Sequence, residues 1–410
     1  TGCDGVTVLN GKIDSYDSAN GAYTTETAGE NGGVATIESG GDIDLSGSGI
    51  VYGNIISNGD IATGTSGAST VVGDMTAAGS IQLKGITSTG DIYAGVDLDL
   101  KNFNAESGQE ITTKGNITNS NSTIGENVSV TYGGDSTIGG IKSSDIVDPD
   151  TYMGTCDPFN ITTVMTDLAT AMGETAATDF SSTMGAGSTL NFSESSVTSL
   201  DSDGNVLLTV SPLTLSLPEE SVSSGTSEIF DESASVYIFG AADLTAKTMN
   251  ISGDITIFIQ GDITTSSTTF TLADDSSSLT LLTTGKIDMN SNTSVVAADD
   301  GILTVDADGE VPLTIYSSYE SDSTAEPDED LALTIGSNGD LYAKVYAPLG
   351  NVSLTGGGNI MGAVRGKQVT FNSSAGQIHY DEALSDINDI SEEEAIPASY
   401  SSVYYHYPVN

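Results

Sequence analysis

Residues 73–92 read GDMTAAGSIQLKGITSTGDI, and this stretch decides the fold. It holds three copies of one triplet, which is glycine, then Asp or Ser, then Ile or Met. Related triplets precede and follow it, and their apolar residues fall into two alternating series. The first series has spacings of 18 and 20 residues and consists of Ile43, Ile61 and Ile81. The second has spacings of 20 and 17 residues and consists of Ile55, Met75 and Ile92.

A repeat of this length predicts one coil of a parallel β-helix with three short sides. Glycine and Asp suit the tight corners, and the branched apolar residue that follows them points inward. A single coil cannot bury its own apolar face, so stacking of coils supplies the core. An ordinary β-sandwich would not keep this spacing. The repeat therefore predicts a solenoid, whose exposed strand edges at both ends must be capped or stacked on a neighbour.

The second half of the chain repeats the pattern. Triplets begin at residues 253, 261, 285, 339, 350 and 358, and segments 255–259 and 341–345 alternate between two faces as strands do. We therefore predict an all-β protein, a parallel β-helix (β-solenoid) in two stretches. The stretches are 35–147 and 236–384, preceded by a docking or capping segment at 1–34.

Residues 148–235 change character and predict a helix-plus-hairpin insertion between the two stretches. Asp157 and Pro158 form a favourable helix start, and the helix is expected to end near Gly173. Its apolar residues recur at helical spacing, which predicts packing onto the solenoid rather than a cofactor site. These residues are Ile161, Val164, Met165, Leu168 and Met172.

Two Asp-Gly turns, at 200–206 and 305–311, lie between apolar segments and predict hairpins. Each also resembles the beginning of a calcium loop, but neither continues to the Glu at the twelfth position. Plain turns are the main interpretation, and weak Ca²⁺ sites are the alternative. The ligands in that case would be Asp201, Asp203, Asp306 and Asp308.

The last segment, 385–410, reads as an acidic linker followed by an aromatic C-terminal strand. Four of its side chains would share one strand face, with Tyr404 on the other: Val403, Tyr405, Tyr407 and Val409. One hypothesis is that this strand is donated to a neighbouring subunit. The alternative is that it folds back on its own solenoid.

Charge narrows the possible partners. Asp and Glu number 57 against 10 Lys and Arg, a formal net charge of −47. Such a chain repels nucleic acid and anionic membranes, because both require a positive surface. No apolar run approaches the length of a membrane helix, so we expect no membrane insertion of the mature chain. Thr1 is an unusual first residue, which suggests that an export segment has been removed.

Two cysteines, Cys3 and Cys156, are expected to form a disulfide in an oxidising compartment. Neither belongs to a cluster with the spacing of a zinc site. We also expect no enzymatic activity, since no nucleophile with an adjacent base stands out and Trp is absent. For His379, a structural hydrogen bond is the preferred interpretation.

Several short motifs resemble the PilX-like family of bacterial exported proteins that are associated with type IV pilus assembly. The motifs lie at 2–6, 13–18, 156–158, 346–348 and 376–384. The resemblance implies a surface location and a structural or adhesive role, without catalytic residues. A looser likeness to bactofilins rests on the solenoid pattern alone.

Together these observations predict an extracellular, cell-surface structural protein that forms a pilus-like filament with copies of itself. Other pilus or surface components are further candidate partners. The alternative is a monomeric adhesin or pilus-tip domain that binds a surface or a glycan. A polysaccharide-active β-helix enzyme is a third interpretation, which we disfavour because a −47 surface would repel acidic substrates.

Overall fold

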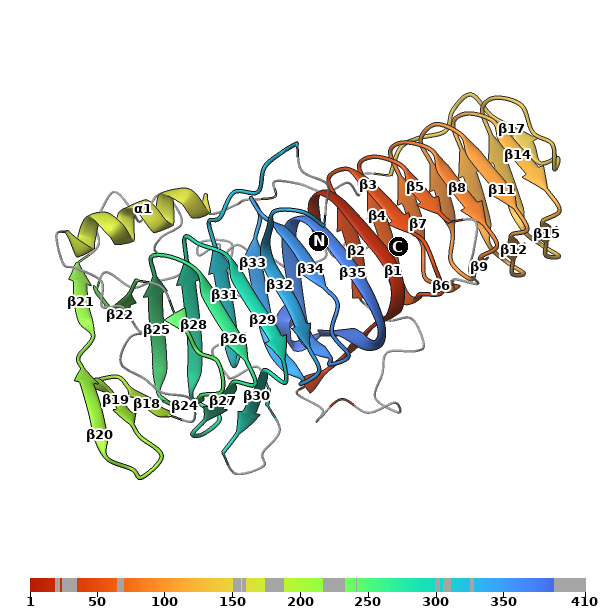
Figure 1. Ribbon diagram of the computed structural model, residues 1–410. Helices are drawn as coiled ribbons and strands as arrows, with labels where there is room; N and C mark the ends of the chain where they lie inside the picture. The colour runs from red at the N-terminus through yellow and green to blue at the C-terminus, as the bar shows by residue number, and fades with distance from the viewer. Residues whose placement is uncertain are drawn as a thin grey trace.

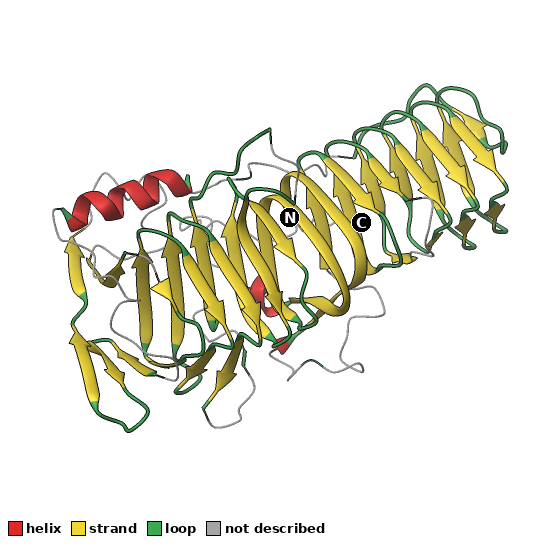
Figure 2. Ribbon diagram, viewed as in Figure 1, coloured by secondary structure: helices red, strands yellow, loops and turns green. Residues whose placement is uncertain are grey.

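The computed structural model shows a rod of stacked β-rungs (Figure 1). Strands make up almost all of its regular structure, as Figure 2 shows. The structure describes residues 1–18, 23, 35–64, 70–149, 156, 160–173, 188–216, 233–240, 242–298, 303–304, 311–324 and 328–386. Within these residues, one sheet system contains 29 strands and a second sheet contains six. The predicted all-β parallel solenoid is thus confirmed.

The N-terminal half, residues 35–142, winds around three sides. The first side holds β2 (Ala35–Ser39), β4 (Ile50–Ser57), β7 (Met75–Ala77), β10 (Ile92–Ala94), β13 (Glu110–Thr113), β16 (Ser129–Tyr132) and β17 (Ile141–Lys142). The second holds β3 (Asp42–Leu45), β5 (Ile61–Thr63), β8 (Ile81–Lys84), β11 (Leu98–Lys101) and β14 (Ile117–Ser120). The third holds β6 (Thr70–Val72), β9 (Thr87–Ser88), β12 (Asn104–Ala105) and β15 (Thr123–Ile124), with the start of β4.

The C-terminal half, residues 233–381, is built in the same way. Its first side holds β22 (Ser233–Phe239), β25 (Asp254–Ile259), β28 (Ser278–Thr283), β31 (Leu313–Ser317), β33 (Leu341–Ala347) and the start of β35 (Ile360–Asp381). Its second side holds β23 (Ala242–Asp243), β26 (Ile263–Ser266), β29 (Ile287–Ser291), β32 (Leu331–Ser337) and β34 (Asn351–Leu354). A separate sheet contains β24 (Thr248–Ser252), β27 (Thr269–Leu272) and β30 (Ser294–Ala297). A short helix, α2 (Ala383–Asp386), follows β35.

The sequence repeat matches the observed strand register. Ile43 pairs with Ile61 and Ile61 with Ile81, all with side chains fully buried. The second predicted series, Ile55, Met75 and Ile92, is likewise stacked residue on residue. Each triplet therefore places its apolar residue in the core, as its spacing predicts.

The glycine of the triplet makes room for an acidic corner. The carboxylate Oδ1 of Asp60 accepts a hydrogen bond of 2.6 Å from the backbone N–H of Ser80 in the next rung. A Cβ on Gly79 would lie 2.1 Å from that same oxygen, so only glycine fits. The same contact recurs with distances of 2.7–2.9 Å in six further pairs, in which the side-chain oxygen of the first residue accepts from the backbone N–H of the second. The pairs are Asp42 and Asp60, Asn54 and Asp74, Asp74 and Asp91, Asp91 and Glu110, Asp97 and Asn116, and Asn116 and Asp135.

The two halves form one continuous stack, joined by β1 (Gly2–Tyr16). This strand lies between β35, the last rung of the C-terminal half, and the first rung of the N-terminal half (Figure 1). The segment expected to dock or cap thus contributes an interior rung. Twelve stacked, buried residues run through the join: Ala242, Ile263, Ile287, Leu333, Val352, Val369, Val6, Ile43, Ile61, Ile81, Leu98 and Ile117.

One end of the stack is closed by antiparallel strands, which is the capped alternative for a solenoid end. There β21 (Leu213–Ser216) pairs with β22, and a meander of β18 (Thr189–Ser193), β19 (Ser196–Leu200) and β20 (Val206–Val210) extends the six-stranded sheet. The antiparallel direction stops the parallel repeat. At the opposite end the parallel strands β14 to β17 terminate without such a meander among the described residues (Figure 1).

The predicted amphipathic helix is present as α1 (Ile161–Met172) and packs on the outside of the C-terminal half. All five predicted apolar residues are buried, against side chains that include Phe258 and Tyr346. The predicted start is wrong. Asn160 caps the helix by accepting a hydrogen bond from the backbone N–H of Thr163, whereas Asp157 and Pro158 lie outside the described residues. The helix ends at Met172 with Gly173 as its C-cap, as expected.

Candidate functional site

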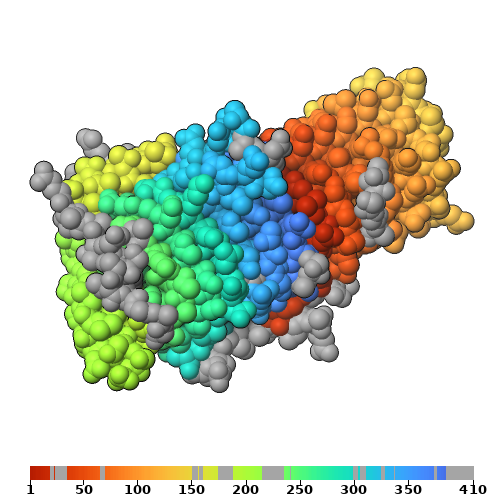
Figure 3. Space-filling view, viewed as in Figure 1, coloured from red at the N-terminus to blue at the C-terminus, as the bar shows by residue number. Residues whose placement is uncertain are grey.

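The contact between β1 and β35, which we call the seam, differs from every other rung contact in the described structure. Elsewhere the chain passes from one rung to the next, but here it pairs strands from its two ends. Val6, for example, lies in register with Val369, and Asp14 with His379, which is 365 residues away in sequence. Because no short chain connection holds these rungs together, the parallel backbone pairing of β1 with β35 and the side-chain contacts across it have to do so. The space-filling view shows the two segments in close contact across the middle of the rod (Figure 3).

A buried ionic cluster spans the seam. Asp14 and His379 are both fully buried, and Asp14 Oδ1 is hydrogen-bonded to His379 Nδ1. The other carboxylate oxygen of Asp14 accepts hydrogen bonds from Lys12 Nζ at 2.9 Å and from the Tyr23 hydroxyl at 3.0 Å. The Tyr23 ring also lies over the imidazole, with ring centroids 3.6 Å apart. We call these four residues the clasp.

The clasp favours an ionised Asp14. Burial alone would raise its pKa, but hydrogen bonds from His379, Lys12 and Tyr23 outweigh burial and lower the pKa below the usual range. Burial and the neighbouring carboxylate together raise the pKa of Tyr23 to about 12. The carboxylate therefore stays charged and hydrogen-bonded across the neutral pH range.

A second cluster of polar residues lies next to the clasp, at the ends of the same two strands. Asp381 is fully buried and accepts hydrogen bonds from the Tyr342 hydroxyl, from the backbone N–H of Ser18 at 3.0 Å and from that of Ala383 at 3.1 Å. Beside it, the Ser15 hydroxyl donates to Glu382 Oε1 at 2.7 Å. Burial, together with the charge of Asp381, raises the pKa of Tyr342. These bonds join the end of β1 to the end of β35.

The predicted disulfide lies at the same seam. Cys3 of β1 is bonded to Cys156, and the carbonyl oxygen of Cys156 accepts a hydrogen bond of 3.3 Å from the Arg365 guanidinium in β35. The segment that leads to Cys156 is attached to the N-terminal half, since the carboxylate of Asp148 contacts the Tyr93 hydroxyl and Lys114. The disulfide thus ties β1 to the segment that connects the two halves.

The four clasp residues are better suited to holding β1 against β35 than to catalysing a reaction. An imidazole beside a carboxylate is a familiar acid–base pair, but both side chains are fully buried and offer no surface to a substrate. His379 thus makes a structural hydrogen bond of the kind we expected. Its partner, Asp14, was not foreseen, because nothing in the sequence indicates that residues 13–16 stack on residues 378–381.

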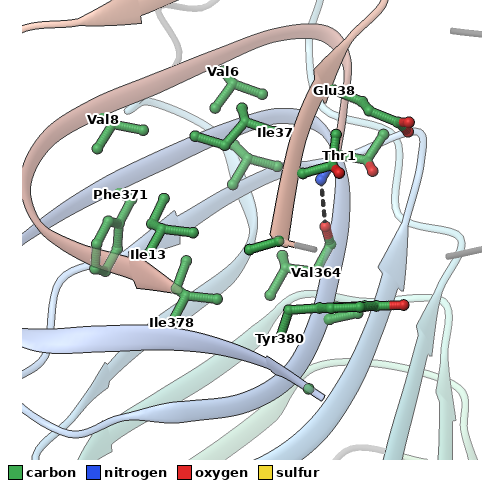
Figure 4. A pocket seen from close by; sticks show the side chains of 15 residues that line it. Thr1, Val6, Val8, Ile13, Ile37, Glu38, Val364, Phe371, Ile378 and Tyr380 are labelled. Atoms are coloured by element: carbon green, nitrogen blue, oxygen red, sulfur yellow. Dashed lines mark hydrogen bonds between the residues drawn. The ribbon is translucent and has the colours of Figure 1, made fainter. Parts of the chain in front are cut away.

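A cavity of about 90 Å³ adjoins the seam inside the solenoid. Its walls are mostly apolar and come from β1, β2 and β35, as Figure 4 shows. Val8, Ile37 and Phe371 line one part of it, and Thr1 and Glu38 supply polar groups at another. Most of the core is otherwise packed residue on residue, so the cavity marks a local interruption of the stack.

Of the four predicted calcium ligands, Asp201 and Asp203 lie within the described residues. One Asp201 oxygen accepts backbone hydrogen bonds from Asp203 and Asn205 at 2.9 and 2.8 Å, so this carboxylate stabilises the predicted hairpin turn between β19 and β20. No group of three or more candidate metal ligands occurs among the described residues. Asp306 and Asp308, and the hairpin expected around them, lie outside those residues, as do Val403, Tyr404, Tyr405, Tyr407 and Val409.

A membrane-spanning helix is absent from the part of the chain that the structure describes. Searches among curated proteins and among solved structures returned no match. The model of a domain of unknown function, DUF7305, matches residues 175–387. That range begins before the antiparallel meander and extends beyond β35 to include α2, so it contains the whole C-terminal half. Because the match covers just over half of the chain, the protein belongs to the DUF7305 family.

Proposed function

We propose that this protein is an extracellular structural component of the cell surface, a rigid rod that assembles with copies of itself into a filament. The observation that carries the proposal is the unbroken column of twelve buried residues that passes through the seam. A core of this kind resists bending, and the polar clusters at the seam reinforce it. The disulfide supports an oxidising compartment outside the cytosol.

Assembly of the rod needs more than end-to-end stacking. A filament made by stacking alone would require two open solenoid ends, and antiparallel strands close one of them here. A second contact is therefore part of the proposal, and the aromatic strand at 403–409 is the candidate. Its alternating side chains suit addition to the edge of a neighbour's sheet. The PilX-like resemblance supports the same role, with other pilus components as further partners.

Negative-stain microscopy at moderate salt tests this proposal. Salt is needed because the charge of −47 opposes association unless it is screened. We expect fibres from the full chain and none after deletion of 399–410. Tyr405→Ser with Tyr407→Ser should also abolish fibres, whereas Tyr404→Ser, on the opposite strand face, should not. Fibres from the truncated chain would exclude strand donation.

The second candidate is a monomeric adhesin or pilus-tip domain, and the closed end of the rod favours it. A solenoid that can stack at one end only is suited to the terminus of an assembly. In that case the purified protein stays monomeric at every salt concentration and binds a surface or a glycan directly. Size-exclusion chromatography with light scattering separates the two candidates.

A further inference from the structure

Among the described residues, the rung that contains β1 lacks one of its sides. On the second side, Val6 lies between Val369 and Ile43, so β1 separates β35 from the next rung. On the third side, Ile13 lies between Ile378 and Val51, so β1 separates the two neighbouring rungs there as well. On the first side, β1 begins only at Gly2, and no described strand lies between the start of β35 and β2.

The missing side leaves a slot one strand wide. Neighbouring strands lie about 4.8 Å apart, so two rungs separated by a third are about 9.6 Å apart. The other two sides impose that separation on β35 and β2. The cavity occupies this place, and its walls include residues 35–38 on one side and 362–364 on the other (Figure 4).

The register of the slot is fixed by the first residues of β1. Gly2 pairs with Gly366 of β35 and with Ser39 of β2. A strand that continued β1 backwards would therefore place the residue before Thr1 between Val364 and Ile37. Two positions earlier it would lie between Gly362 and Ala35, which leave room for a larger side chain. The nitrogen of Thr1 already donates to the Val364 carbonyl at 2.7 Å, as an amide in such a strand would.

We propose that the slot is a strand-acceptor site, and that its occupant is a polypeptide segment that continues β1 on the N-terminal side of Thr1. The segment is about four residues long, runs parallel to β35 and β2, and carries apolar side chains at alternate positions. Direction, register and covalent continuity all favour it over a strand from a second copy. Any polypeptide upstream of it leaves the molecule at the middle of the rod, between the two halves, and not at either end.

Two extensions of equal composition test the proposal on the full chain. The first adds Ser-Val-Thr-Val before Thr1, which places both valines against the interior. The second adds Val-Ser-Val-Thr, which shifts the same residues by one position and turns the valines outward. We expect the first extension to raise the melting temperature by about 4 °C and to slow amide exchange at residues 35–38 by about tenfold or more. The second should change neither.

Trimming by an aminopeptidase gives a readout that does not depend on overall stability. The first extension should resist trimming, because its backbone is hydrogen-bonded on both sides, whereas the second should be removed. Equal trimming and equal exchange of the two extensions would overturn the proposal. Protection of residues 35–38 that appears only in an oligomer would also overturn it, since the slot would then take a strand from a second copy.

Discussion

Removal of the Asp14 carboxylate should weaken the seam more than any other single charge deletion. The substitution Asp14→Ala removes the common acceptor of His379, Lys12 and the Tyr23 hydroxyl, and this acceptor is fully buried. Breaking a buried, hydrogen-bonded pair by removing one partner costs about 3–5 kcal/mol. That loss is a large part of the roughly 5–15 kcal/mol that keeps a typical domain folded.

Urea denaturation followed by circular dichroism measures this loss, and Asp148→Ala is the matched control. Asp148 also contacts a lysine and a tyrosine, but it does so on the surface, with 48% of its side chain exposed. We expect a much smaller shift in the control. The double substitution Asp14→Leu with His379→Leu should recover part of the lost stability, because it removes both fully buried polar partners and leaves only Lys12, whose side chain is 18% exposed. Equal midpoints for Asp14→Ala and the control would refute the role assigned to the clasp.

Three further predictions concern pH, the corners and the disulfide. Because the pKa of Asp14 is lowered in the folded protein, the contribution of Asp14 to stability is complete above about pH 4 and is lost as the pH falls below that value. Asp14→Ala should therefore flatten the acid side of a plot of melting temperature against pH. Gly79→Ala should lower the free energy of unfolding by about 1–3 kcal/mol, because its Cβ would meet a stacked carboxylate. Gly5→Ala is the control in the same urea assay and should be close to neutral, because the nearest atom to its Cβ would be 3.4 Å away. Reduction of the bond between Cys3 and Cys156 should lower the free energy of unfolding by about 5 kcal/mol in the chain-entropy model. A reductant should therefore lower the melting temperature of the protein and leave that of Cys3→Ser unchanged.

Local sequence predicted those parts of the fold that the triplet marks. The glycine, the acidic corner and the inward Ile occur together, so the spacing of Ile43, Ile61 and Ile81 could be read directly as the number of residues in one rung. The helical spacing of α1 was equally informative about its buried face. Its start was not, because Asp157 and Pro158 satisfy the usual rule while the chain uses Asn160 as the cap.

The order of the rungs along the rod could not be predicted in this way. The segment around Val6 and Val8 alternates as a strand should, but alternation does not say which strand it joins. Its partners in β35 lie more than 360 residues later, and nothing local distinguishes a capping segment from an interior rung. The clasp shares this difficulty, since Asp14 and His379 become neighbours only once the two ends of the described chain are stacked.

The most direct test of the seam is an engineered disulfide between Thr7 and Thr370. These residues are register partners on β1 and β35, and adjacent strands place their Cα atoms about 4.8 Å apart, within the range that a disulfide tolerates. If the first rung lies on the last, Thr7→Cys with Thr370→Cys should form this bond on mild oxidation within a monomer, as mass spectrometry of the linked peptides would show. The absence of that link in the folded, oxidised protein would contradict the continuous stack.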